Sequence, residues 1–143
     1  MAFAEGYAGS PLLQNRWIRL LRPIQWSKNA VVLAALVFGQ VYDDPGTVSA
    51  AFGAVIAFCL ISSAGYIFND LLDAARDKLH PVKRSRPIAS GAIPARQGIV
   101  LAVVLAVMSF LLAMMIEPLL ALMVVLYGAL MAGYSLAWKR IPV

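Results

Sequence analysis

Long apolar runs separated by short polar segments dominate the chain. They lie at about 27–42, 48–69, 97–116 and 119–138. A transmembrane helix needs about 20 mostly apolar residues to cross roughly 30 Å of hydrocarbon. Three runs meet this length. The first is short and needs Trp26 and Tyr42 to extend it into the interfaces. The pattern predicts an all-α fold, a polytopic membrane helical bundle with four transmembrane helices.

The low content of charged residues supports this prediction. Charged residues make up 13% of the chain and hydrophobic residues 62%, whereas a soluble domain carries about 25% charged residues. A water-facing surface cannot be built from so few charges. The net charge of +5 is then better explained by attraction to an anionic membrane surface than by binding of nucleic acid. Cys59, the single cysteine, lies inside an apolar run and is expected to pack as a small hydrophobe.

The distribution of basic residues predicts the orientation of the bundle. With four spans, the N-terminal segment, the long loop 70–96 and the C-terminus share one side. The two short loops on the other side carry only Asp43, Asp44 and Glu117. All twelve basic residues fall on the first side: Arg16, Arg19, Arg22, Lys28, Arg76, Lys78, Lys83, Arg84, Arg86, Arg96, Lys139 and Arg140. Because cytoplasmic loops carry the excess of Lys and Arg, we expect both termini and the loop 70–96 to be cytoplasmic.

The N-terminal residues divide into two parts. Residues 1–15 are small and polar and are expected to form a mobile tail. Residues 16–21 are basic and amphipathic and include Trp17, so this segment suits the membrane interface. Pro23 interrupts it.

Three carboxylates follow the second apolar run. If the helix continues, Asp70, Asp73 and Asp77 lie at i, i+3 and i+7 and share one stripe. Like charges on one stripe repel, and Mg²⁺ would relieve that repulsion, because it takes one or two carboxylates and completes its shell with water and substrate phosphates. Asn69 could add an amide group. The alternative is a solvated helix end whose acids pair with neighbouring basic residues.

A basic segment comes next. Lys83, Arg84 and Arg86 lie within four residues, close to prolines and a glycine that shape the loop. Their charges can neutralise phosphate oxygens, Arg through a planar fork and Lys as a point charge. A loop that grips lipid headgroups is the other interpretation, and the acid-then-base order favours a substrate site.

Three sequence elements together resemble the UbiA superfamily of intramembrane prenyltransferases. They are NDxxDxxxD at 69–77, KRxRPIASG at 83–91 and RPxQWxKN at 22–29. The last element and the Lys83–Arg84 pair most resemble the branch of decaprenyl-phosphate phosphoribosyltransferases, whereas typical aromatic prenyltransferases carry an Arg-Thr pair before the Arg-Pro of the loop. The resemblance covers nearly the whole chain.

The resemblance implies that residues 16–143 form the N-terminal half of a UbiA-type transferase domain in a bacterial plasma membrane. It implies Mg²⁺ as the cofactor, phosphoribosyl diphosphate as the donor and a polyprenyl (decaprenyl) phosphate lipid as the acceptor, in cell-wall biosynthesis. In that interpretation the three aspartates are catalytic and hold the metal on the donor diphosphate. The implied substrate-binding residues are Asn69, Lys83, Arg84, Arg86, Lys28 and Asn29. Lys28 also suits a snorkelling anchor, and His80 suits a structural role.

Two alternatives remain open. One is a prenyltransferase that moves a polyprenyl group from its diphosphate to an aromatic acceptor. The other is a non-catalytic truncated membrane protein. Family members are longer and carry a second acidic cluster on a later helix, whereas Glu117 is the only acid after Asp77 here. We expect the second half-site to come from a missing C-terminal half or from a second chain, and we favour a fragment.

Overall fold

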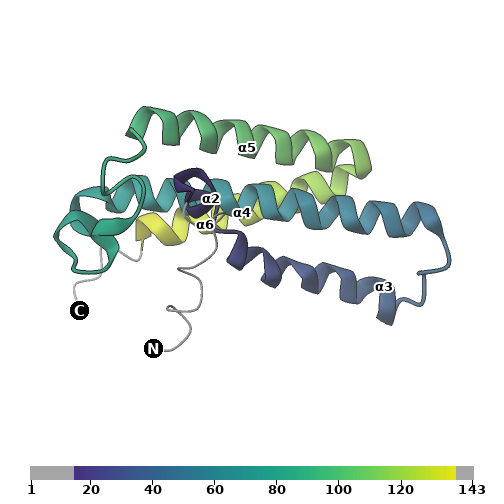
Figure 1. The fold of residues 1–143 in the computed structure, drawn as a ribbon. Helices are drawn as coiled ribbons and strands as arrows, with labels where there is room; N and C mark the ends of the chain where they lie inside the picture. The colour runs from purple at the N-terminus through teal and green to yellow at the C-terminus, as the bar shows by residue number, and fades with distance from the viewer. Residues whose placement is uncertain (1–14, 138–143) are drawn as a thin grey trace.

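The protein is a bundle of helices arranged around one long helix (Figure 1). The structure is a computed structural model and describes residues 15–137; the first fourteen residues of the predicted tail, together with Lys139 and Arg140, lie outside that range. Its elements are α2 (Arg16–Leu21), η1 (Pro23–Leu33), α3 (Ala34–Phe38), α4 (Pro45–Leu79), η2 (Lys83–Ser85), α5 (Ala95–Ile116) and α6 (Pro118–Ala137). No strand occurs in this part of the chain, which confirms the all-α prediction.

Helix α4 is the longest element and carries the acidic motif. Its N-cap is Asp44, whose carboxylate accepts hydrogen bonds from the backbone N–H groups of Gly46 and Thr47, and Pro45 occupies the first helical position. It ends before Pro81, because a residue that precedes proline is pushed to extended geometry, and His80 has ψ 131°. Its 35 residues extend about 52 Å at 1.5 Å per residue. The helix is therefore longer than the hydrocarbon core, and its last turns carry the carboxylates beyond the apolar run.

The continuation of α4 changes one predicted boundary. The sequence placed the start of the motif loop at residue 70, but the helix runs on to Leu79 and the loop occupies residues 80–94. The short η2 and several turns give this loop its shape. The three aspartates of the acidic motif thus lie on a helix, whereas Lys83, Arg84 and Arg86 lie on the loop that follows it.

The first predicted span, 27–42, has a different form. Residues 27–38 lie in the 3₁₀ helix η1 and the five-residue helix α3, and residues 39–42 follow outside any helix. A 3₁₀ helix rises about 2.0 Å per residue, so η1 and α3 together extend about 30 Å. Among the described residues, three helices are long and apolar enough to cross a membrane, namely α4, α5 and α6. A fourth span therefore remains a prediction.

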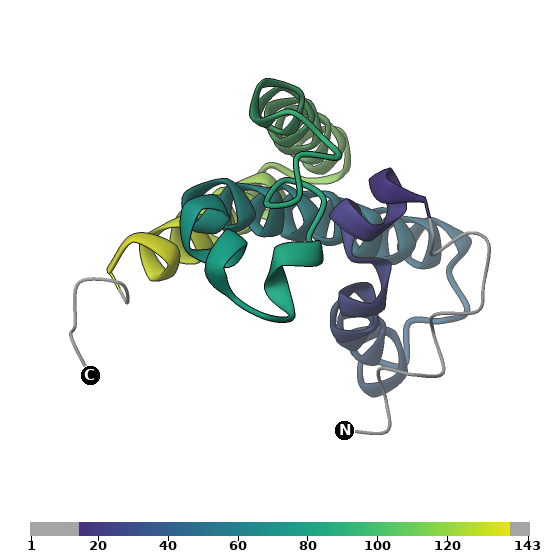
Figure 2. The same cartoon turned by 60° about the vertical axis from the view of Figure 1, so that its left-hand side comes forward.

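Helices α5, α6 and η1 all pack against α4, from different sides (Figure 2). One buried cluster joins α2, α4, the loop and α5, and includes Leu20, Ile67 and Ile93. A second joins α4, α5 and α6 through small residues such as Ala57 and Ala113. Most of the remaining apolar side chains on α5 and α6 are exposed, as expected for helices that face lipid.

Candidate active site

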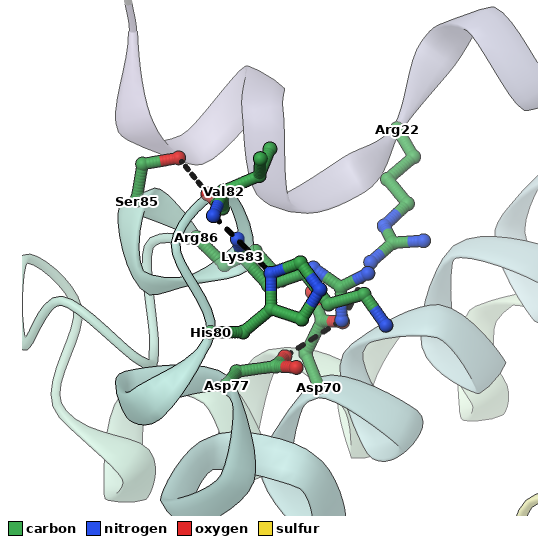
Figure 3. A network of polar contacts seen from close by, with 8 residues as sticks. All are labelled: Arg22, Asp70, Asp77, His80, Val82, Lys83, Ser85 and Arg86. Carbon is green, nitrogen blue, oxygen red and sulfur yellow. Dashed lines mark hydrogen bonds and ion pairs between the residues drawn. The ribbon is translucent and has the colours of Figure 1, made fainter.

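Two buried aspartates of α4 form the centre of the candidate site. Asp70 and Asp77 are each 2% exposed and lie two turns apart on one side of the helix. Arg86 from the loop bridges them: its Nη1 lies 2.7 Å from Oδ2 of Asp77 and 3.2 Å from Oδ1 of Asp70 (Figure 3). The helix and the loop are thus joined at the acidic motif.

Arg22 supplies a second cation to the same carboxylate. Its Nη2 lies 2.6 Å from Oδ1 of Asp70, and its guanidinium lies 5.0 Å from the centroid of the Tyr66 ring. Arg22 ends α2 in the left-handed region, with φ 53° and ψ 56°, a conformation that costs a non-glycine residue about 1–3 kcal/mol. The buried ion pair and the cation–π contact offset that strain. We call Arg22, Asp70, Arg86 and Asp77 the ion-pair network.

His80 shapes the basic loop. Its Nδ1 accepts hydrogen bonds from the backbone N–H groups of Val82 and Lys83, at 3.2 and 3.3 Å (Figure 3). The Ser85 hydroxyl donates to the Val82 carbonyl at 2.9 Å. The His80 side chain therefore stabilises the turn by accepting backbone hydrogen bonds, consistent with a structural role.

A cavity of about 600 Å³ lies beside the network, between α4 and α6. Arg22 and Asn69 line its polar part, and Tyr66, Tyr127 and Tyr134 contribute aromatic rings. Most of the remaining lining is apolar. The cavity therefore combines a cationic edge with a largely hydrophobic wall, a combination that suits an amphiphilic substrate.

The predicted site residues are only partly brought together. Asp70, Asp77 and Arg86 meet in the network, and Asn69 borders the cavity. Asp73 is half-buried on the same helix. Lys83 and Arg84 are exposed on η2.

The N-terminal candidates lie apart from the network. Asn29 is buried and its side-chain amide donates to Sγ of Cys59 at 3.5 Å, while Lys28 is exposed. The principal residue missing from the predicted set is Arg22. Its arginine-proline position in the RPxQWxKN element was the available signal, but nothing in the sequence shows that it reaches Asp70.

Carboxylate oxygens are ligands that hard divalent cations prefer. Within residues 15–137, no group of three or more His, Cys, Asp or Glu side chains is arranged to hold a metal ion, so the geometry does not assemble the predicted three-carboxylate cluster. Two buried carboxylates do share one cation, Arg86. Mg²⁺ needs only one or two carboxylates when water and phosphate supply the other ligands. Asp70 and Asp77 fit that requirement.

The fold and the site together define an integral membrane protein with an acidic and basic site at one end of its helices. A family model described as the UbiA prenyltransferase family matches residues 30–143. The chain belongs to this family of transferases. The sequence-based resemblance is thereby confirmed.

Several curated relatives refine this assignment. A decaprenyl-phosphate phosphoribosyltransferase of Mycobacterium tuberculosis is 41% identical over 127 residues, which cover 86% of this chain and 42% of the relative. The protein of the same name from Corynebacterium glutamicum is 39% identical over 136 residues, 92% of this chain and 41% of the relative. A 4-hydroxybenzoate octaprenyltransferase of Vibrio atlanticus is 38% identical over 65 residues, 46% of this chain and 23% of the relative. The chain spans less than half the length of each of these relatives.

Proposed function

We propose that the chain forms part of a membrane transferase that moves a phosphoribosyl group from phosphoribosyl diphosphate to a polyprenyl phosphate, with Mg²⁺. The observation that carries the proposal is the ion-pair network, placed directly beside a largely apolar cavity. A diphosphate requires cations and a metal-binding carboxylate pair, whereas a polyprenyl lipid requires an apolar wall. The names of the mycobacterial and corynebacterial relatives support the same substrates.

In this proposal, Asp70 and Asp77 would hold Mg²⁺, with Asp73 on the same helix as a further ligand. When bound, the metal would neutralise charge on the donor diphosphate. Arg86, Lys83 and Arg84 would bind the phosphate oxygens that the carboxylates repel. These cations stabilise the diphosphate as it leaves, and such electrostatic stabilisation is usually the largest catalytic contribution.

The transfer itself exchanges one bond for another. A phosphate oxygen of the lipid attacks the anomeric carbon of the ribose, and the bond from that carbon to the diphosphate breaks. The lipid phosphate is already anionic, so no general base is required, consistent with the backbone contacts that His80 makes. Arg22 belongs to the network and also lines the cavity, where it can bind either phosphate.

The remaining parts of the site would come from elsewhere. Relatives extend well beyond the matched region, and we propose that the missing C-terminal half or a second chain supplies the facing acidic cluster. We further propose that the protein lies in a bacterial plasma membrane with the loop 80–94 on the cytoplasmic side, where a water-soluble donor is available. The asymmetric distribution of basic residues supports this orientation.

A second candidate is transfer of a polyprenyl group to an aromatic acceptor. The three tyrosines in the cavity wall suit a flat aromatic ring, and the Vibrio relative is named for such a reaction. The same aspartates and arginines would then bind the diphosphate of the lipid donor.

A comparison of donor substrates distinguishes phosphoribosyl transfer from prenyl transfer. Membranes that contain the chain together with its missing half are supplied with labelled phosphoribosyl diphosphate and polyprenyl phosphate, or with polyprenyl diphosphate and 4-hydroxybenzoate. We expect label from the first donor in lipid, and about a 100-fold loss or more in Asp70→Asn. Asp43→Asn, an exposed position beyond the other end of α4, is the matched control. Label only from the second donor supports the prenyl alternative, and no transfer from either would favour a non-catalytic protein.

A further inference from the structure

A second hollow lies outside the candidate active site, between α2 and the first half of α5. Its volume is about 500 Å³, and its lining comprises Trp17, Arg96, Gln97, Val100, Leu101 and Val104. None of these residues belongs to the ion-pair network or lines the larger cavity. We call this hollow the α2–α5 groove.

One end of the groove is cationic. Arg96 and Gln97 are exposed in the first turn of α5, which contains no acidic residue, so the arginine adds its charge to the positive end of the helix. The guanidinium of Arg16 lies 6.0 Å from the centroid of the Trp17 ring, and its Nη1 donates to the carbonyl of Ala92, just before α5, at 3.0 Å. No acidic side chain among residues 15–137 lines the groove.

The other end of the groove is apolar and open. Val100 is 57% exposed and Val104 46% exposed. Val107 and Leu111, also exposed, continue the same face of α5, since residues spaced by three and four positions lie above one another on a helix. Leu101, which lines the groove, is partly buried and packs against the buried cluster that includes Leu20. A cationic end therefore leads into a hydrophobic strip along the axis of a transmembrane helix.

We propose that the α2–α5 groove binds an anionic phospholipid of the surrounding bilayer. Its phosphate would lie between Arg16 and Arg96, and one acyl chain would follow Val100, Val104 and Val107. Tryptophan and arginine are the side chains that anchor proteins at the level of lipid headgroups, and here they come from two separate elements. The inference does not depend on the proposed transferase activity, because it concerns residues outside that site.

Photolabelling tests the proposal. The chain is reconstituted in phosphatidylcholine vesicles that contain a small fraction of phosphatidylglycerol with a photoactivatable group on one acyl chain. The comparison uses phosphatidylcholine with the same group. Peptide mass spectrometry then maps the labelled residues. We expect phosphatidylglycerol to label residues 100–107 several-fold more than phosphatidylcholine does, because only its headgroup carries a net negative charge for the two arginines.

Charge variants make the test specific. Arg96→Gln should reduce labelling by phosphatidylglycerol to the level of phosphatidylcholine. Because the Arg96 side chain makes no hydrogen bond or ion pair within residues 15–137, this variant should fold normally. Arg76→Gln removes the same charge from an exposed position on α4 and should leave labelling unchanged. Equal labelling by both lipids, an equal loss in both variants, or cross-links from this face to a second copy of the chain would overturn the proposal.

Discussion

Arg22 and Asp70 are separated by 48 positions in the sequence and joined by a 2.6 Å contact between Nη2 and Oδ1. Arg22 ends the amphipathic helix α2, and Asp70 lies on α4 where the apolar run gives way to the acidic motif. The contact therefore fixes α2 to the candidate active site. A change at either residue should affect both stability and the geometry of the site.

Replacing Arg22 with glutamine should destabilise the fold by about 1–3 kcal/mol, because a buried carboxylate loses one of its two cations. The double variant R22Q/D70N should be more stable than R22Q, since the unpaired charge is then absent. Thermal unfolding in detergent measures the stability of R22Q, D70N and the double variant. Arg19→Gln, whose guanidinium donates to the exposed carbonyl of Ser85, is the control. Additive effects of R22Q and D70N would show that the pair is not coupled.

Ser63 should be far more sensitive to substitution than its neighbour Ser62. Both are buried, but the Ser63 hydroxyl donates to the carbonyl of Leu21 at 2.8 Å and accepts from Nε1 of Trp26 at 2.9 Å. Ser63→Ala leaves both partners unsatisfied and should cost about 1–3 kcal/mol. Within residues 15–137 the Ser62 hydroxyl makes no side-chain hydrogen bond, so Ser62→Ala should change the unfolding temperature little. Equal effects would contradict the role assigned to the hydroxyl.

Gly65 marks a close approach of α4 and α6. A Cβ atom at this position would lie 2.8 Å from Sδ of Met131. Gly65→Ala would displace the flexible end of the Met131 side chain from its present conformation, which should cost about 0.5–1.5 kcal/mol, and Met131→Ala should restore part of the loss. Gly133→Ala is the matched control, because nothing lies within 4 Å of its added Cβ. Equal unfolding temperatures for Gly65→Ala and Gly133→Ala would contradict the close approach at Gly65.

The N-cap of α4 predicts a pH dependence. Hydrogen bonds from the Thr47 hydroxyl and from the backbone N–H groups of Thr47 and Gly46 lower the pKa of Asp44 below its ordinary value. A carboxyl whose pKa is lowered by folding contributes stability above its unfolded pKa and loses it as the pH falls through the folded value. We expect Asp44→Asn, which can still cap the helix, to remove this acid-dependent part of the unfolding profile. Asp43→Asn should retain the acid-dependent part of the profile. An unchanged profile in Asp44→Asn would show that Asp44 is not its source.

The candidate site could be predicted in part because its chemistry is local. Asp70, Asp73 and Asp77 follow one another at helical spacing, and Arg86 lies only nine positions after Asp77. The pairing with Arg22 could not be predicted, since it depends on the left-handed turn that redirects the chain after α2. The contact of Asn29 with Cys59 could not be predicted either, because it depends on how η1 lies against α4.

The sequence by itself determined that the chain is all-α and suited to a membrane, because long apolar runs exclude a soluble surface and because a backbone in lipid must satisfy its own hydrogen bonds. It also determined the family, through short motifs. Only the tertiary structure decided that α4 continues through the acidic motif to Leu79, that residues 23–33 form a 3₁₀ helix, and that Arg22 and Arg86 converge on Asp70. The physical reason is that these features depend on side-chain contacts between distant segments, which local hydrophobic periodicity does not encode.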